Sequence, residues 1–182
     1  QQAYGIYLDG NFNQLSNSGN IVTQGGSSAY GVYISAGSSL AAVENNFSSV
    51  TNSGNINALD HGIYNRDHFS HLTNSGIITA ANVATIYGIN NEGNGAQINN
   101  SGTINANRYA IYNDGDDVTI TNSGTLNGGL RLGNSDFYIL GGAINGEFKG
   151  NDETNVYIGS NAITTNYTQQ QNYEDLKNLT IN

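Results

Sequence analysis

The chain has 182 residues, of which 37% are hydrophobic and only 10% are charged, and its formal net charge is −9. Five basic residues cannot neutralise a run of phosphates, so nucleic acids and anionic membrane surfaces are poor candidates as partners. The absence of Cys excludes disulfides and thiolate metal sites, and no apolar run is long enough for direct membrane insertion.

Two short motifs recur along the chain and set its organisation. The first begins with an aromatic residue and has an aliphatic residue at its third position, whereas the second has Asn-Ser-Gly between two aliphatic residues. The aromatic motif reads YGIY from Tyr4, YGVY from Tyr30, HGIY from His61, YGIN from Tyr87 and YAIY from Tyr109. The Asn-Ser-Gly motif reads LSNSGNI from Leu15, VTNSGNI from Val50, LTNSGII from Leu72, INNSGTI from Ile98 and ITNSGTL from Ile120.

The spacing of these motifs predicts a solenoid. In four copies the first residue of the aromatic motif precedes the Asn of the second motif by the same interval, as from Tyr4 to Asn17 and from His61 to Asn74. The shortest complete period is about 22 residues, and fixed periods of this length are typical of solenoids. No window has a useful helical period, so short equivalent strands are expected to pair in parallel from coil to coil. We therefore expect an all-β parallel β-helix of about six to seven coils over residues 1–165.

Side-chain alternation along the strands predicts three inward ladders of aliphatic residues. One occupies the third position of the aromatic motif, and the other two flank Asn-Ser-Gly. The ladders are Ile6, Val32, Ile63, Ile89 and Ile111; Leu15, Val50, Leu72, Ile98 and Ile120; and Ile21, Ile56, Ile78, Ile104 and Leu126.

The Asn of the second motif follows an inward residue by two positions, and we expect it in a tight turn between two faces. Its amide can bond to the coils above and below, or the residue can simply tolerate the backbone of the turn. Both interpretations give these residues a structural role. The predicted ladder consists of Asn17, Asn52, Asn74, Asn100 and Asn122.

An inward third position places the fourth residue of the aromatic motif on the outside. We expect Tyr7, Tyr33, Tyr64 and Tyr112 to form an exposed aromatic stripe that Asn90 interrupts once. Such a stripe could stack on sugar rings or on a second copy of the chain. The alternative is that the tyrosines only pack on one another as a β-favouring ladder.

The second coil contains an insertion from Ile34 to Phe47, which is a second candidate binding surface. Loops on a rigid scaffold often carry function, and the binding candidates there are Ser38, Glu44, Asn45 and Asn46. The alternative is an excursion that packs on its own coil.

After Leu126 the repeat changes. Gly142-Ala143-Ile144 matches Gly124-Thr125-Leu126 at a shorter interval than the period of the preceding coils, which predicts smaller coils. The polar segment 166–182 lacks the repeat, and we expect it to be a C-terminal cap or connecting tail, with a short helical turn from Tyr173 to Leu179 as one option.

The Asn-Ser-Gly repeats, followed by LNGGLRLGNSD from Leu126 and GGAING from Gly141, resemble the passenger region of bacterial autotransporters. The resemblance covers about residues 3–160. It implies a right-handed β-helix that is secreted or held at the bacterial cell surface, with roles in adhesion, self-association or display. The implied partners are a glycan or protein on a host or neighbouring cell, or a second copy. An outer-membrane β-barrel is expected only in a longer parent chain.

Candidate metal sites in the sequence are weak. His61, His68 and His71 lie near Asp60 and Asp67, but imidazole ligands bind a metal only where they converge. The segment 113–117 resembles part of a calcium loop, yet it lacks the spacing and the closing Glu of an EF-hand. We expect no metal and no cofactor.

Candidate catalytic groups are equally sparse. Asp116 and Asp117 are adjacent, so they would point to opposite sides of a strand rather than converge as glycosidase carboxylates do. The three Arg residues are scattered over different coils. We expect a non-enzymatic adhesin, self-association surface or display stalk. The alternatives are a structural subunit of a bacterial surface layer or sheath, and a polysaccharide lyase or hydrolase.

Overall fold

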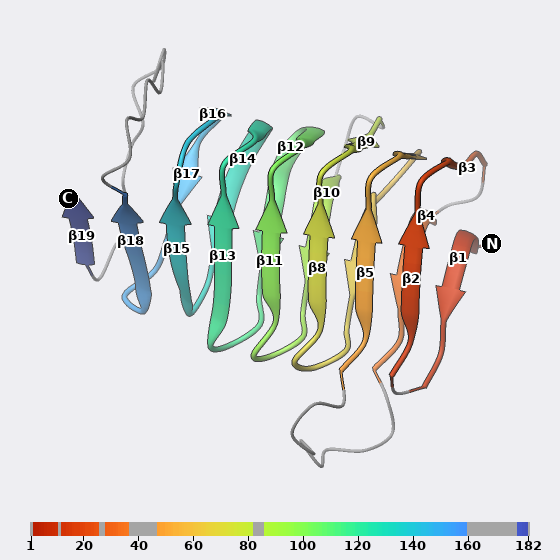
Figure 1. Cartoon of the computed structure of the whole chain (residues 1–182), viewed down its shortest axis with the longest axis horizontal. Coiled ribbons are helices and arrows are strands. Elements are labelled where there is room, and N and C mark those ends of the chain that lie inside the picture. The colour runs from red at the N-terminus through yellow and green to blue at the C-terminus, as the bar shows by residue number, and fades with distance from the viewer. Residues whose placement is uncertain are drawn as a thin grey trace.

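The computed structural model describes residues 2–10, 12–25, 28–36, 47–81, 86–159 and 178–181. These residues form strands and no helix, and the strands belong to two parallel sheets. Figure 1 shows the strands side by side along the long axis of the molecule, with β1 at one end and β19 at the other. The expected parallel β-helix is confirmed, with about six turns at a spacing of about 22 residues. Within the described ranges no helix is long and apolar enough to cross a membrane.

The strands fall into three sets. The first set contains the aromatic motif and consists of β1 (Gln2–Leu8), β4 (Ser28–Ile34), β7 (Ile63–Asn65), β10 (Tyr87–Asn91) and the second half of β12 (Thr103–Asn113). The second set is β2 (Gln14–Asn17), β5 (Ser49–Asn52), β8 (His71–Asn74), β11 (Gln97–Asn100), β13 (Val118–Asn122), β15 (Ser135–Ile139), β18 (Thr154–Ile158) and β19 (Asn178–Ile181). The third set is β3 (Asn20–Thr23), β6 (Asn55–Ala58), β9 (Ile77–Ala80), the first half of β12, the first part of β14 (Thr125–Leu132) and β16 (Ala143–Asn145). The second part of β14 and β17 (Phe148–Lys149) continue the first set.

The second set forms an eight-stranded sheet by itself, whereas the first and third sets share one eleven-stranded sheet. They are joined because β12 runs without interruption from the third face into the first and pairs with both β9 and β10. The three inward ladders are confirmed. Their members from the second coil onward are buried in one continuous core, while Ile6 and Leu15 of the first coil are partly buried against it.

The Gly at the second position of the aromatic motif is explained by two close contacts, one with the third inward aliphatic ladder and one with the backbone of the next coil. A Cβ on Gly62 would lie 2.6 Å from the carbonyl oxygen of Gly88, and a Cβ on Gly88 would lie 2.7 Å from that of Ala110. A Cβ on Gly62 would lie 2.2 Å from Cγ2 of Ile78, and a Cβ on Gly88 would lie 2.2 Å from Cγ2 of Ile104. In the fifth coil the motif has Ala110 instead, and the register places Leu126 where the preceding coil has Ile104. Leu has no β-branch, so it leaves room for the methyl group of Ala110. Ala110 also lies at a register shift between β12 and β14 and has no register partner on β14.

Because Ala110 packs near Leu126, the fifth coil should not tolerate the Ile that the preceding coils have at the position of Leu126. Leu126→Ile is expected to destabilise the protein by about 1–3 kcal/mol, because the new branch overpacks against Ala110. Adding Ala110→Gly should recover most of that loss, although Gly in a strand has its own smaller cost. Urea unfolding of the parent, both single variants and the double variant measures the coupling. Strictly additive effects would contradict the proposed contact.

The coils become shorter toward the C-terminal end, as expected. Thr125 pairs with Ala143, and the neighbouring pair Asn127 and Asn145 is separated by 18 residues. The last described strand, β19, pairs with β18, with Leu179 beside Val156. The helical turn suggested for Tyr173 to Leu179 is therefore wrong at residues 178 and 179, which belong to β19, and the rest of that segment lies outside the described residues. The boundary predicted at residue 165 lies outside the described residues.

Candidate binding surfaces

The outer side of the aromatic-motif strands forms a face two rings wide, which we call the tyrosine face. The predicted stripe residues supply one column, and the first residues of the motif supply the other. The columns are Tyr7, Tyr33, Tyr64 and Tyr112, and Tyr4, Tyr30, His61, Tyr87 and Tyr109. Neighbouring ring centroids lie 4.5 to 5.8 Å apart, so the rings form one connected cluster over five coils.

The second column was missed because simple alternation would turn the first residue of the motif inward. The structure breaks that alternation at the following Gly, whose Cα lies against the third ladder. The first and fourth residues therefore both point outward. A Gly between an aromatic and an aliphatic residue is the sequence signal for this bend.

The rings of the tyrosine face pack mainly on one another, through stacked, tilted and edge-to-face contacts. Of its tyrosines only Tyr7 is exposed, at 48%, whereas Tyr30 and Tyr109 are buried. Tyr7 and Tyr33 are 5.2 Å apart and 9° from parallel, and Tyr87 and Tyr112 are 4.5 Å apart and 9° from parallel. His61 stacks on Tyr87 at 4.9 Å. Because neighbouring rings cover these faces, the groups that remain for a partner are mainly ring edges and hydroxyls. The ladder packing that was the alternative interpretation is thus present, and any binding role remains a prediction.

The stripe is interrupted at Asn90, as expected, but Asn90 is not exposed. It pairs between Tyr64 and Tyr112, and only 6% of its surface is accessible. Its Oδ1 is buried and has no hydrogen-bond partner within the described part of the chain. The ring of Tyr64 is turned perpendicular to Tyr33, at 89°, beside this interruption.

All four basic residues that the structure describes lie along the tyrosine face. Arg66 Nη1 donates to the Tyr33 hydroxyl at 3.4 Å, and Arg131 Nη1 donates to the Tyr112 hydroxyl at 2.6 Å. The guanidinium of Arg108 lies 5.1 Å from the centre of the Tyr109 ring, and Lys149 is the register partner of Arg131. In a chain of net charge −9 the positive charges are therefore concentrated on one face.

A polar cluster connects the third and fourth coils on this face. Glu92 accepts a hydrogen bond from the Tyr64 hydroxyl and forms an ion pair with Arg66 at 3.3 Å. Burial raises the pKa of the Tyr64 hydroxyl, and the hydrogen bond to Glu92 raises it further. Tyr64 is consequently a hydrogen-bond donor, not a base.

His61 belongs to the packing of the same face. Burial lowers the pKa of its imidazole, although the carboxylates of Asp60 and Glu92 act in the opposite direction. Its Nδ1 accepts the backbone N–H of Tyr87 at 3.3 Å, which requires an unprotonated nitrogen. His61 therefore replaces a tyrosine in the column.

The predicted Asn ladder is continuous through five coils. The Nδ2 atoms of the first four residues donate to the Oδ1 of the next Asn at 2.7 to 2.8 Å. All five also donate to the carbonyl oxygen of the Gly two residues later. The ladder consists of Asn17, Asn52, Asn74, Asn100 and Asn122, all of which are buried. Its role in the fold is to provide hydrogen bonds for the backbone of the turn between the second and third faces.

Sequence reasoning missed a second buried ladder after the aromatic motif. Asn65 Nδ2 donates to Asn91 Oδ1 at 2.6 Å, and Asn91 Nδ2 donates to Asn113 Oδ1 at 2.7 Å. These amides also bond to carbonyl oxygens two residues later. The available signal was the Asn at the fifth position of the motif in three successive coils.

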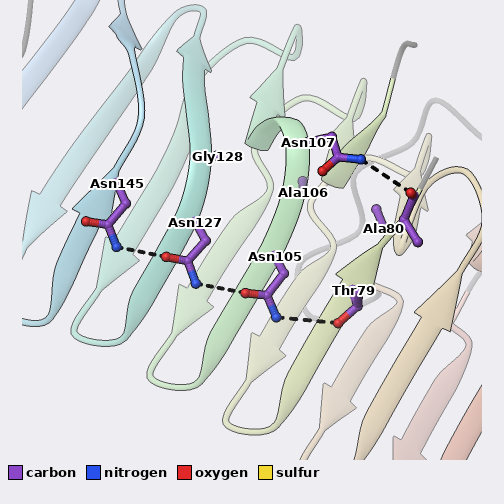
Figure 2. A pocket seen from close by; sticks show the side chains of 9 residues that line it. Thr79, Ala80, Asn105, Ala106, Asn107, Asn127, Gly128 and Asn145 are labelled. Carbon is purple, nitrogen blue, oxygen red and sulfur yellow. Dashed lines mark hydrogen bonds between the residues drawn. The ribbon is translucent and has the colours of Figure 1, made fainter. Parts of the chain in front are cut away.

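An additional row of polar side chains, which we call the outer Asn ladder, lies on the surface and borders a groove of about 580 Å³. Figure 2 shows Asn145, Asn127, Asn105 and Thr79 in a row along this groove. The amides of Asn145 and Asn127 each donate to the next Asn at 2.8 Å, and Asn105 donates to Thr79 Oγ1 at 3.4 Å. Ala80, Ala106 and Gly128 also line it. The lining has no titratable side chain, so it supplies neutral hydrogen-bonding groups but no acid or base.

The histidines do not converge on a metal. His68 Nδ1 accepts the backbone N–H of Asn94, whereas the ring of His71 lies 3.8 Å from the ring of Phe47. Within the described ranges no group of three His, Cys, Asp or Glu side chains could hold a metal ion.

Acidic residues line a second groove, of about 310 Å³, near the C-terminal coils. Asp117, Asp136 and Glu153 face it together with Asn134 and Asn155. Asp136 accepts a hydrogen bond from the Asn155 amide at 2.8 Å.

Four further binding candidates were predicted in the insertion of the second coil. Ser38, Glu44, Asn45 and Asn46 lie outside the described residues.

No family model, no curated protein and no solved structure matches the chain.

Proposed function

We propose that the chain is a non-enzymatic segment of an extracellular, autotransporter-like surface protein, and that its tyrosine face makes the adhesive contacts. The observation that carries this proposal is that nine aromatic residues in mutual contact and all four described basic residues lie on one face. Tyr and Arg are the residue types that dominate binding energy at protein interfaces. Their partner is a surface glycan or protein of another cell, or a second copy of the chain.

The geometry of the face also suits repeated contacts. Successive coils are spaced at about 4.8 Å, so identical groups recur along the axis with a fixed separation. A partner that binds one coil can therefore bind the next, and several weak contacts add up to useful avidity.

The proposal is tested by displaying the chain on non-adherent bacterial cells. In the test variant Tyr33, Tyr64 and Tyr112 are all changed to Ser, and adhesion to cells and cell aggregation are measured. We expect a folded protein with at least a tenfold loss of adhesion or aggregation. The matched control changes Thr51, Thr73 and Thr121 to Ala. These residues lie on β5, β8 and β13 of the eight-stranded sheet, away from the tyrosine face. Adhesion equal to the parent in a folded tyrosine variant would overturn the proposal.

A further inference from the structure

A column of phenylalanines lies at the corner that precedes the eight-stranded sheet. Phe12, Phe47 and Phe69 each stand three residues before the inward aliphatic residue of the Asn-Ser-Gly motif, in the segments FNQLSNSG, FSSVTNSG and FSHLTNSG. The strands that follow them, β2, β5 and β8, pair in register, so the three residues occupy the same place in three consecutive coils. We call them the phenylalanine column.

The phenylalanine column does not contribute to the core. Phe12 is 51% exposed and Phe69 is 48% exposed, while Phe47 is partly exposed. The two other phenylalanines of the chain, Phe137 and Phe148, are fully buried. The ring of Phe47 packs against the ring of His71 at 3.8 Å, whereas the exposure of Phe12 and Phe69 is not explained by packing.

Two members of the column also have an unfavourable backbone conformation. The φ angles of Phe12 and Phe69 are 68° and 55°, in the left-handed region. The same position of the next two coils has Gly95, with φ of 65°, and Asp117, with φ of 55°. Gly adopts this conformation without a steric penalty and Asp tolerates it, but a bulky aromatic residue is strained. Strain that is retained at an exposed position points to a function outside the fold.

The ring of Phe69 is held in place against the next coil. Its backbone N–H donates to the carbonyl oxygen of Asn94 at 2.7 Å. A Cβ built on Gly95 would lie 2.5 and 2.7 Å from Cδ1 and Cε1 of Phe69, so the ring rests on the backbone of Gly95. Among the described residues no ring stacks on Phe12 or Phe69, in contrast to the tyrosine face. Ring surface is therefore open to a ligand and is already positioned.

A column of neutral polar residues runs beside the phenylalanines. Gln14, Ser49 and His71 follow Phe12, Phe47 and Phe69 by two residues, and they pair in register with one another. They offer an amide, a hydroxyl and an imidazole as hydrogen-bonding groups. Open aromatic rings next to neutral hydrogen-bonding groups match the apolar faces and the hydroxyls of a sugar.

We propose that the phenylalanine column binds a neutral oligosaccharide, with sugar rings on Phe12 and Phe69 and sugar hydroxyls on Gln14, Ser49 and His71. Two half-exposed phenylalanines offer about 100 Å² each, whereas a stable protein partner needs about 800 Å² per side. The ligand is neutral because the described basic residues all lie on the tyrosine face. This inference rests on the proposed adhesive function, but it assigns saccharide recognition to a different surface.

The test uses the whole chain with isotope-labelled phenylalanine rings, titrated with the hexasaccharides of cellulose, chitin and β-mannan. We expect at least one of them to shift the ring signals of Phe12 and Phe69, while the signals of the buried Phe137 and Phe148 stay in place. Phe12→Asn and Phe69→Asn together should keep or raise the melting temperature, because Asn suits the left-handed conformation. The same double variant should lose saccharide affinity at least tenfold. Unshifted ring signals with all three saccharides, or unchanged affinity in the double variant, would overturn the inference.

The tyrosine variant separates this inference from the proposed function. Tyr33, Tyr64 and Tyr112 changed to Ser should leave the saccharide affinity within twofold of the parent, because these residues do not touch the phenylalanine column. If adhesion depends on the tyrosine face while no saccharide moves the phenylalanine signals, only the inference fails. If saccharide affinity is lost in the tyrosine variant and kept in the phenylalanine variant, the ligand binds the tyrosine face and the inference is again overturned.

Discussion

Ile78→Asp is expected to abolish cooperative folding, whereas Ile77→Asp is expected to leave the protein folded. These adjacent residues of β9 point in opposite directions: Ile78 is 0% exposed and Ile77 is 44% exposed. Ile78 lies between Ile56 and Ile104 in the third inward ladder. A carboxylate there is buried without a partner, which costs several kcal/mol. A total stability of about 5–15 kcal/mol does not withstand such a change in mid-ladder.

Far-UV circular dichroism during thermal unfolding measures this difference. The Ile77 variant serves as the matched control, because it introduces the same charge one residue away in the same strand. Comparable melting temperatures for the two variants would show that the facing of β9 is wrong by one residue.

Asn74→Ala is expected to lower the free energy of unfolding by about 2–4 kcal/mol, because two buried amides each lose a partner. Asn74 accepts from Asn52 Nδ2 at 2.8 Å and donates to Asn100 Oδ1 at 2.8 Å. It is 1% exposed, so water does not readily replace these bonds.

The outer Asn ladder at the surface groove provides the control for this prediction. Asn127 has the same two kinds of amide neighbour, in Asn105 and Asn145, but it lies at the surface groove. Asn127→Ala should cost less than about 1 kcal/mol, since water can satisfy the neighbours. Urea unfolding measures both values. Equal losses in the two variants would show that burial of the inner ladder has no special effect.

The fold could be predicted because each coil repeats the same order of strands and turns. The two motifs return an aliphatic residue to the same slots of each coil although insertions lengthen some coils, and this regularity fixes the parallel pairing, the facing of Ile63 and Ile89, and the Asn-Ser-Gly turn. The buried ladder at Asn65 was equally visible in the sequence, but its motif lacks the conspicuous Ser-Gly that follows Asn74.

Other features depend on local geometry that periodicity does not report. The outward direction of Tyr30 comes from the bend at Gly31, whose Cα lies against Ile56. Asn90 is buried between its register partners Tyr64 and Tyr112, although alternation places it on the outside. The exposure of Phe69 follows from a left-handed turn conformation, which a sequence predicts for Gly or Asn but not for Phe.

The candidate site was predicted only in part. Alternation placed Tyr33 and Tyr64 outside, and the structure adds Tyr30 and His61 beside them. That the rings of this face stack on one another depends on side-chain angles, which the sequence pattern does not determine.

Removal of one complete coil tests the repeat architecture most directly. Residues 103–124 span one period of 22 residues, and their deletion joins Gly102 to Thr125, the register partner of Thr103. The shortened protein is expected to keep a β-sheet circular dichroism spectrum and a cooperative thermal transition, because each remaining coil stacks on an equivalent one. Deletion of Thr103–Asn113 alone removes β12 and leaves the next strands on the wrong face, so this control should not fold cooperatively. Loss of cooperative folding in the full-coil deletion, or cooperative folding in both deletions, would contradict the architecture.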